Sequence, residues 1–180
     1  MNLDNNYDWK FIYSNVFSNT LDTKLIWFQC RIVHNILATN NFLQKIGIKN
    51  DPNCCFCNNE IENIKHIFYD CYCVKRLWND IKNWFNENNN EHFAFTLIDI
   101  LFLKNGKKFK AFNTCIILIK NYIYKKRFFD KVLEFEEIKF QLKSYYEIEK
   151  YMYKIRGEIE IFNRRWAILK IYFLTSMLLS

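Results

Sequence analysis

Glycine and proline are scarce in this chain, which has three glycines and one proline among its 180 residues. Sheet-rich folds use these residues in their tight turns, so their scarcity argues against such folds. Hydrophobic residues make up 51% of the chain and aromatic residues 19%, which is enough to build a buried core and excludes an intrinsically disordered chain. The composition therefore predicts an all-α protein, an irregular helical bundle of long helices joined by short polar loops.

Long hydrophobic runs are also missing. A helix that spans a bilayer needs about 20 consecutive apolar residues, whereas the longest candidates here are CIILI from Cys115 and IYFLTSMLL from Ile171. The first residues, MNLDNNYD, lack the basic and apolar regions of a secretory signal. We therefore expect an intracellular protein, in the cytoplasm or the nucleus, that is not secreted and has no membrane partner. A reducing compartment favours metal binding over disulfides for clustered cysteines.

Acidic residues are few in the second half of the chain. Residues 1–100 contain nine Lys or Arg and eleven Asp or Glu, whereas residues 101–180 contain seventeen and eight. The formal net charge of +7 therefore comes from the C-terminal part. Such an asymmetry suggests contact with a polyanion, nucleic acid in particular, although a solvated helix face would give the same pattern.

Four potential metal ligands follow one another closely: Cys54, Cys57, His66 and Cys71. Three thiolates and one imidazole complete a closed tetrahedral shell, the usual form of structural zinc, whereas catalytic zinc keeps one position open for water. We therefore predict one structural Zn²⁺ in a small Cys3His module. The alternative is a set of ordinary buried cysteines, but a CxxC followed at close range by His and Cys is typical of zinc sites.

Two choices around this quartet need separate arguments. Cys71 and Cys73 both follow His66, and in a continuing helix Cys73 would lie about 10 Å further along the axis. Cys71 is thus the better ligand if the helix ends there, with Cys73 as the alternative, while Cys55 should diverge from the metal. Glu62 lies one turn before His66 and is expected to accept a hydrogen bond from the imidazole nitrogen that faces away from the metal; it would equally suit the helix start.

Apolar residues recur at helical spacing along most of the chain. The segments expected to be helical are 7–17, 23–37, 40–47, 61–69, 74–85, 93–103, 109–128, 134–156 and the final apolar and basic stretch from 160. Thr39 is expected to cap the third helix and Gly47 to end it. The polar run NENNNEH at 86–92 predicts a linker. Three parts follow: N-terminal helices at 1–50 that pack on the zinc module, the zinc module at 51–86, and a basic helical region at 87–180.

A known family shares these features. The segment FQCRIVHNILATNNFLQKIG, the four candidate ligands, Glu62 and VKRLW ending at Trp78 resemble, in order and spacing, the zinc-binding region at the C-terminal end of reverse transcriptases from non-LTR (LINE-type) retrotransposons. The resemblance covers about residues 20–85, and residues 100–170 are similar to the basic helical tail of such proteins. It implies that the parent protein copies element RNA into DNA at a nicked chromosomal target, and that this region helps to hold nucleic acid.

The chain departs from the catalytic part of that family. It has no Asp-Asp dipeptide, which such polymerases need for their two metal ions, and it is too short for a palm domain. Tyr72 stands where such proteins often carry Pro. We therefore expect a fragment that is not an enzyme and has no small-molecule substrate, with RNA or single-stranded DNA and the remainder of the reverse transcriptase as partners.

The candidate nucleic-acid contacts lie in the basic C-terminal part. Cationic side chains would neutralise phosphates and an aromatic ring would stack on an unpaired base; the candidates are Lys125, Lys126, Arg127, Arg164, Arg165 and Trp166. One alternative is a structural module whose aromatic stripes dock on the rest of the polymerase. Another is a zinc hydrolase, which would need an open metal position and a general base such as Glu60 or Glu62.

Overall fold

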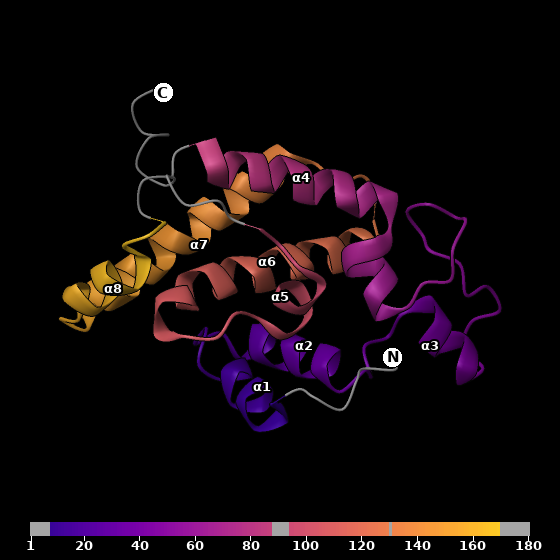
Figure 1. Ribbon diagram of the computed structural model, residues 1–180, viewed down its shortest axis with the longest axis horizontal. Helices are drawn as coiled ribbons and strands as arrows, with labels where there is room; N and C mark the ends of the chain where they lie inside the picture. The colour runs from indigo at the N-terminus through magenta and orange to yellow at the C-terminus, as the bar shows by residue number, and fades with distance from the viewer. Residues whose placement is uncertain (1–7, 88–93, 130, 170–180) are drawn as a thin grey trace.

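The computed structural model describes residues 8–87, 94–129 and 131–169. Within these ranges the chain is helical and contains no named strand, only an isolated antiparallel bridge between Asn53 and Ile61, so the predicted all-α class is confirmed. The helices are α1 (Trp9–Val16), α2 (Thr23–Val33), α3 (Asn40–Lys45), η1 (His66–Asp70), α4 (Tyr72–Glu87), α5 (Leu97–Phe102), η2 (Lys107–Phe109), α6 (Lys110–Lys126), α7 (Phe135–Ile155) and α8 (Ile159–Trp166) (Figure 1).

Helix α6 lies at the centre of the bundle. Most of its residues between Ala111 and Ile123 are buried, which fits a helix that is apolar on nearly every side. Helices α2, α7, α8 and η1 pack against it, and Figure 1 shows α4 on one side of α6 and α1 and α2 on the other. One core connects buried residues from Ile12 to Leu169. The division into three parts stays a prediction, and most of the expected linker at 86–92 and the apolar tail from Ile171 lie outside the described residues.

Local polar residues set the ends of the N-terminal helices. The Asp22 side chain accepts hydrogen bonds from the first turn of α2, and Thr39 caps α3 by accepting from the Phe42 N–H at 3.3 Å, as predicted. The expected helix at 23–37 is too long, because α2 ends at Val33. Asn35 has a φ of +56°, a left-handed conformation that asparagine tolerates better than most residues. This turn leaves Ile36 exposed instead of extending the apolar stripe of α2.

No helix in the described ranges is both long and apolar enough to cross a bilayer.

Candidate metal centre

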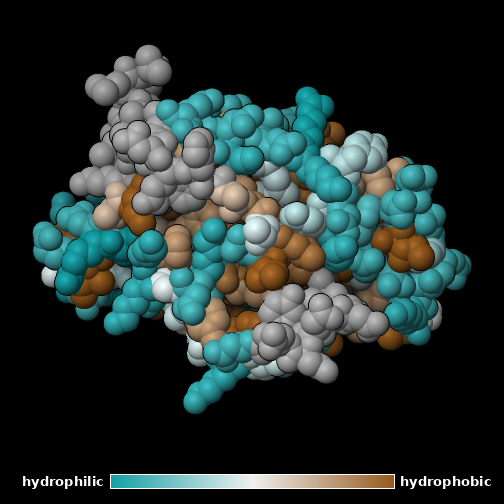
Figure 2. Space-filling view, viewed as in Figure 1, coloured by the Kyte–Doolittle hydropathy of each residue, from teal (hydrophilic) through white to brown (hydrophobic). Residues whose placement is uncertain are grey.

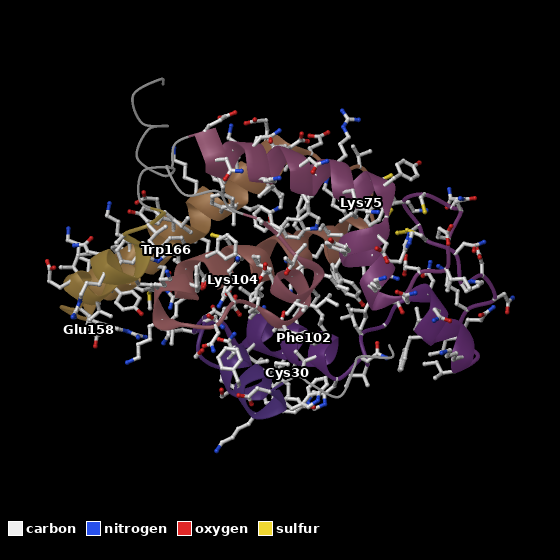
Figure 3. The ribbon with its side chains drawn as sticks, in the orientation of Figure 1. Cys30, Lys75, Phe102, Lys104, Glu158 and Trp166 are labelled. Carbon is white, nitrogen blue, oxygen red and sulfur yellow. The ribbon has the colours of Figure 1, made fainter. Side chains whose placement is uncertain are left out.

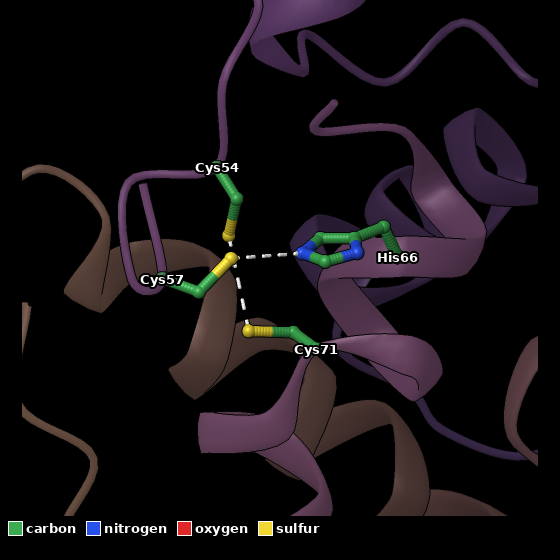
Figure 4. A group of neighbouring side chains, drawn as sticks. All are labelled: Cys54, Cys57, His66 and Cys71. Carbon is green, nitrogen blue, oxygen red and sulfur yellow. Dashed lines mark hydrogen bonds between the residues drawn. The ribbon is translucent and has the colours of Figure 1, made fainter. Parts of the chain in front are cut away.

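The loop that carries Cys54 and Cys57 folds back on itself. The Cys54 N–H donates to the Glu60 carbonyl at 2.8 Å and the Asn58 N–H donates to the Cys54 carbonyl at 2.8 Å. Asn58 adopts a φ of +53° where the loop reverses, and the bridge between Asn53 and Ile61 closes its base. These bonds fix a tight turn whose two thiols point into the same space (Figure 4).

A wide helical turn supplies the other two ligands. The Asn63 side chain accepts a hydrogen bond from the His66 N–H at 2.9 Å, and the Cys71 N–H donates to the His66 carbonyl at 2.9 Å, the five-residue bond of a π-helix. In an α-helix two residues five apart would point about 140° away from each other, whereas the wider turn brings them toward one side. The helix stops at Cys71, whose ψ is 129°, so the condition that favoured Cys71 as a ligand is met.

The four predicted ligands meet at one point in the structure. Their ligand atoms all lie within 4.8 Å of one another. The Sγ atoms of Cys54 and Cys71 are 3.9 Å apart, and Cys57 Sγ lies 3.4 Å from His66 Nε2 (Figure 4). Tetrahedral zinc, with bonds of about 2.3 Å to sulfur and 2.0 Å to nitrogen, would separate two sulfurs by about 3.8 Å and sulfur from nitrogen by about 3.5 Å. The donor set therefore fits zinc.

The two buried thiols of the quartet, Cys54 and Cys71, affect each other's ionisation. The pKa of Cys54 is lowered by the side-chain contacts that Cys55 and Cys71 make with it. The pKa of Cys71 is raised, first by its contact with Cys54 and then by burial. Cys54 and Cys71 therefore do not ionise together readily, because the thiolate of Cys54 is stabilised by the proton that Cys71 keeps. A bound divalent cation supplies the positive charge that lets all three ligate as thiolates.

Two other cysteines stay outside this quartet. The Cys73 thiol lies 3.7 Å from the Phe56 carbonyl as a donor, and Cys55 is half-buried and is not one of the four clustered ligands. Cys54 and Cys71 are fully buried and His66 is 7% exposed. Four donors complete a tetrahedral shell, which leaves no position for the water that a zinc hydrolase activates.

Glu62 is placed differently from the prediction. Its carboxylate accepts hydrogen bonds from the backbone N–H groups of Asn40 at 2.7 Å and Cys55 at 3.2 Å, and it forms an ion pair with Arg127. The expected hydrogen bond to His66 is therefore wrong: the side chain is taken up by α3, the ligand loop and the end of α6. Glu62 still supports the site, because it holds the loop through Cys55. No local motif predicts Arg127 as its partner, since the two residues are 65 positions apart.

The basic cluster at the end of α6 is mostly engaged within the protein. Arg127 is buried; besides pairing with Glu62, it donates to the Ala38 carbonyl at 2.9 Å and packs over the Tyr124 ring at 4.8 Å. Lys126 pairs with Glu137 at 2.8 Å, whereas Lys125 is exposed. The guanidinium of Arg127 compensates a buried carboxylate, and its contact with nucleic acid stays a prediction.

The second basic cluster, on α8, is also mostly engaged in contacts within the protein. Trp166 is 1% exposed and donates from its indole N–H to Glu149 at 2.6 Å, where α8 meets α7 (Figure 3). Arg165 lies 3.4 Å from Glu149 and donates to the Thr114 hydroxyl at 2.7 Å. The indole of Trp166 is covered in this position, and its stacking on a base stays a prediction. Arg164 is exposed, and together with Lys125 it is what remains of the predicted contacts on the open surface.

Fold and site together define a helical module held together by a Cys3His cluster suited to structural zinc. Residues 2–78 match the family model described as zinc-binding in reverse transcriptase. This range contains all four ligands and ends at Trp78, whose indole N–H donates to the Phe68 carbonyl at 2.8 Å and ties α4 to η1. Searches of curated proteins and of solved structures return no match.

Proposed function

We propose that the chain is a non-catalytic, nucleic-acid-binding zinc module from the C-terminal end of a LINE-type retrotransposon reverse transcriptase. One structural Zn²⁺ holds the ligand loop to η1, and the module binds RNA or single-stranded DNA beside the polymerase. The observation that carries the proposal is the closed Cys3His cluster inside the range that matches the reverse transcriptase family.

The surface supports a polyanionic partner even though several predicted contacts are buried. Exposed cations remain on several elements: Lys75, Arg76 and Lys82 on α4, Lys107 and Lys108 on η2, Lys125 at the end of α6 and Arg164 on α8. Lysine and arginine side chains that neutralise phosphates release counterions from the nucleic acid, and this release drives binding at low salt.

Fluorescence anisotropy of the zinc-loaded full chain with a labelled single-stranded RNA and its DNA equivalent tests the proposal. We expect the logarithm of the binding constant to fall linearly with the logarithm of salt concentration, with a slope of about −0.7 for each phosphate contacted. The double variant Lys125→Gln, Arg164→Gln should lose about 1.4 from that slope, while its free energy of unfolding changes by less than about 0.5 kcal/mol. Absence of binding by the wild-type chain, or binding that salt does not weaken, would contradict the proposal.

A second candidate function is docking on the remainder of the polymerase, and one feature of α7 favours it. Five large apolar side chains on this helix are exposed by 42–72%, and the last four recur at the three- and four-residue spacings of one helix side: Phe140, Ile148, Tyr151, Met152 and Ile155. Exposed apolar stripes of this kind mark interaction surfaces. In this case Ile148→Glu should abolish association with the polymerase domain in a pull-down, and the Lys125, Arg164 variant should bind nucleic acid as well as the wild type.

A further inference from the structure

A groove of about 310 Å³ lies between α4, the end of η1 and the segment that leads into α5. Aromatic side chains form much of its lining: Trp78 is buried, and Tyr69 and Phe95 are half-buried. Two exposed lysines of α4, Lys75 and Lys82, also line it. In Figure 2 a more apolar band lies beside the hydrophilic surface of α4, and Figure 3 shows Lys75 on α4 close to η1.

The charge of this groove is positive. Lys75 and Lys82 are seven residues apart, so they lie on the same face of α4 and about 10 Å apart along its axis. Within the described part of the chain neither lysine forms an ion pair, and no carboxylate is among the described residues that line the groove.

Two aspartates next to the lining residues are already paired with other lysines. Asp70 pairs with Lys65 at 3.2 Å, and Asp99 pairs with Lys104 at 3.4 Å. By contrast, the larger groove between α4 and residues 131–136 contains Asp80, along with two glutamates. The groove beside Lys75 and Lys82 is therefore the better match for an anion.

The aromatic lining is held in place by its own contacts. The rings of Trp78 and Phe95 lie 5.2 Å apart, and Phe112 stacks on Phe95 at 5.5 Å with an angle of 9° between the ring planes. The hydrogen bond from Trp78 to the Phe68 carbonyl fixes the indole. Fixed rings provide a stacking surface at low entropic cost, and single-stranded nucleic acids are bound in this way by stacking on aromatics beside cations.

We propose that this groove binds one unpaired base of a single-stranded nucleic acid against the half-buried rings of Tyr69 and Phe95, with the flanking phosphates on Lys75 and Lys82. The proposal rests on the nucleic-acid-binding function proposed above and names the contact surface for it. The groove is at the small end of ligand pockets, which suits one nucleotide and not a duplex.

The lysines are tested with a matched pair of variants. Lys75→Gln, Lys82→Gln should reduce the salt slope of binding to an oligouridylate by about 1.4, whereas Lys10→Gln, Lys24→Gln, which removes the same charge from α1 and α2, should leave the slope as it is. Equal slopes for both double variants, with the wild type still binding, would overturn the groove and leave the proposed function standing. A wild-type chain that does not bind would overturn both.

The aromatic contact is tested separately, because Tyr69 lies between two zinc ligands and its removal can disturb the fold. Tyr69→Leu should weaken binding about 5- to 100-fold, the range expected for losing one stacked base, and Tyr69→Phe should restore it. In the unmodified chain, a 5-iodouridine oligonucleotide should cross-link under ultraviolet light to Tyr69, Trp78 or Phe95. Cross-links found only elsewhere, or an abasic strand that binds as tightly as the intact one, would overturn the proposal.

Discussion

The ion pair between Arg127 and Glu62 can be tested directly, because the sequence pattern places Arg127 on the surface and the structure buries it. The side chain of Glu62 is fully buried, and Arg127 is the cation that pairs with it, while Asn40 and Cys55 each donate one N–H. Arg127→Met keeps most of the side-chain volume but leaves a buried carboxylate without its cation, which costs about 3–5 kcal/mol. A domain of this kind has a total stability of about 5–15 kcal/mol, so we expect a large loss.

Urea unfolding in the presence of zinc measures this cost, and competition with a chelator measures zinc affinity, which should fall because Glu62 holds the ligand loop. Lys125→Met is the matched control, since it removes an exposed cation two residues away and should change the free energy of unfolding by less than about 0.5 kcal/mol. The double variant Glu62→Gln, Arg127→Met should be more stable than Arg127→Met alone. If Arg127→Met lowers the free energy of unfolding by less than about 1 kcal/mol and also weakens nucleic-acid binding, this reasoning is refuted, and Arg127 is a surface residue that contacts nucleic acid.

Three further predictions concern a metal ligand and two buried side chains. Cys57→Ser should reduce the zinc content, measured by plasma mass spectrometry, from one ion per chain to nearly none and lower the helix content in circular dichroism, since structural zinc contributes about 10–16 kcal/mol to folding; Cys73→Ser should keep the metal. Burial lowers the pKa of Lys120 in the folded protein well below 10.5, the value in the unfolded chain. Between the folded and the unfolded pKa the unfolded chain binds more protons, so the free energy of unfolding should rise with pH. Lys120→Met should abolish that rise in urea titrations at about pH 7 and pH 9. Trp166→Phe removes the hydrogen bond to Glu149 and should cost about 1–3 kcal/mol of stability. Its nucleic-acid affinity should not change. Lower nucleic-acid affinity at unchanged stability would show that the ring is not buried.

The Cys3His cluster was predictable because its parts are local. All four ligands lie between Cys54 and Cys71, within a reach fixed by one turn and one short helix, so residue type and spacing were sufficient. The all-α class was predictable for a similar reason. The spacing of apolar residues is a property of each segment by itself, and few glycines or prolines interrupt it. Thr39 and the φ of +73° at Gly47 show that helix ends with strong local signals also follow the sequence.

The role of the basic residues was not predictable from spacing. Arg127 and Trp166 look like solvent-facing members of basic clusters until the fold brings carboxylates against them: Glu62, from a loop 65 residues away, and Glu149, from the preceding helix α7. The early end of α2 depends on the backbone of one residue, Asn35. Contacts between segments determine the partners of these side chains. Hydrophobic periodicity carries no information about which carboxylate pairs with which basic or indole group.

The wide turn of η1 gives the interval between His66 and Cys71 a structural meaning. Its closing hydrogen bond spans five residues, one more than an α-helical turn. Ordinary helical winding at the same spacing would turn the thiol about 140° away from the imidazole and break the shell while leaving every ligand type in place. Backbone conformation at this point is therefore as restrictive as ligand chemistry: inserting one neutral residue, which would place the two ligands about 120° apart on an ordinary helix, should harm metal binding as much as the loss of a ligand.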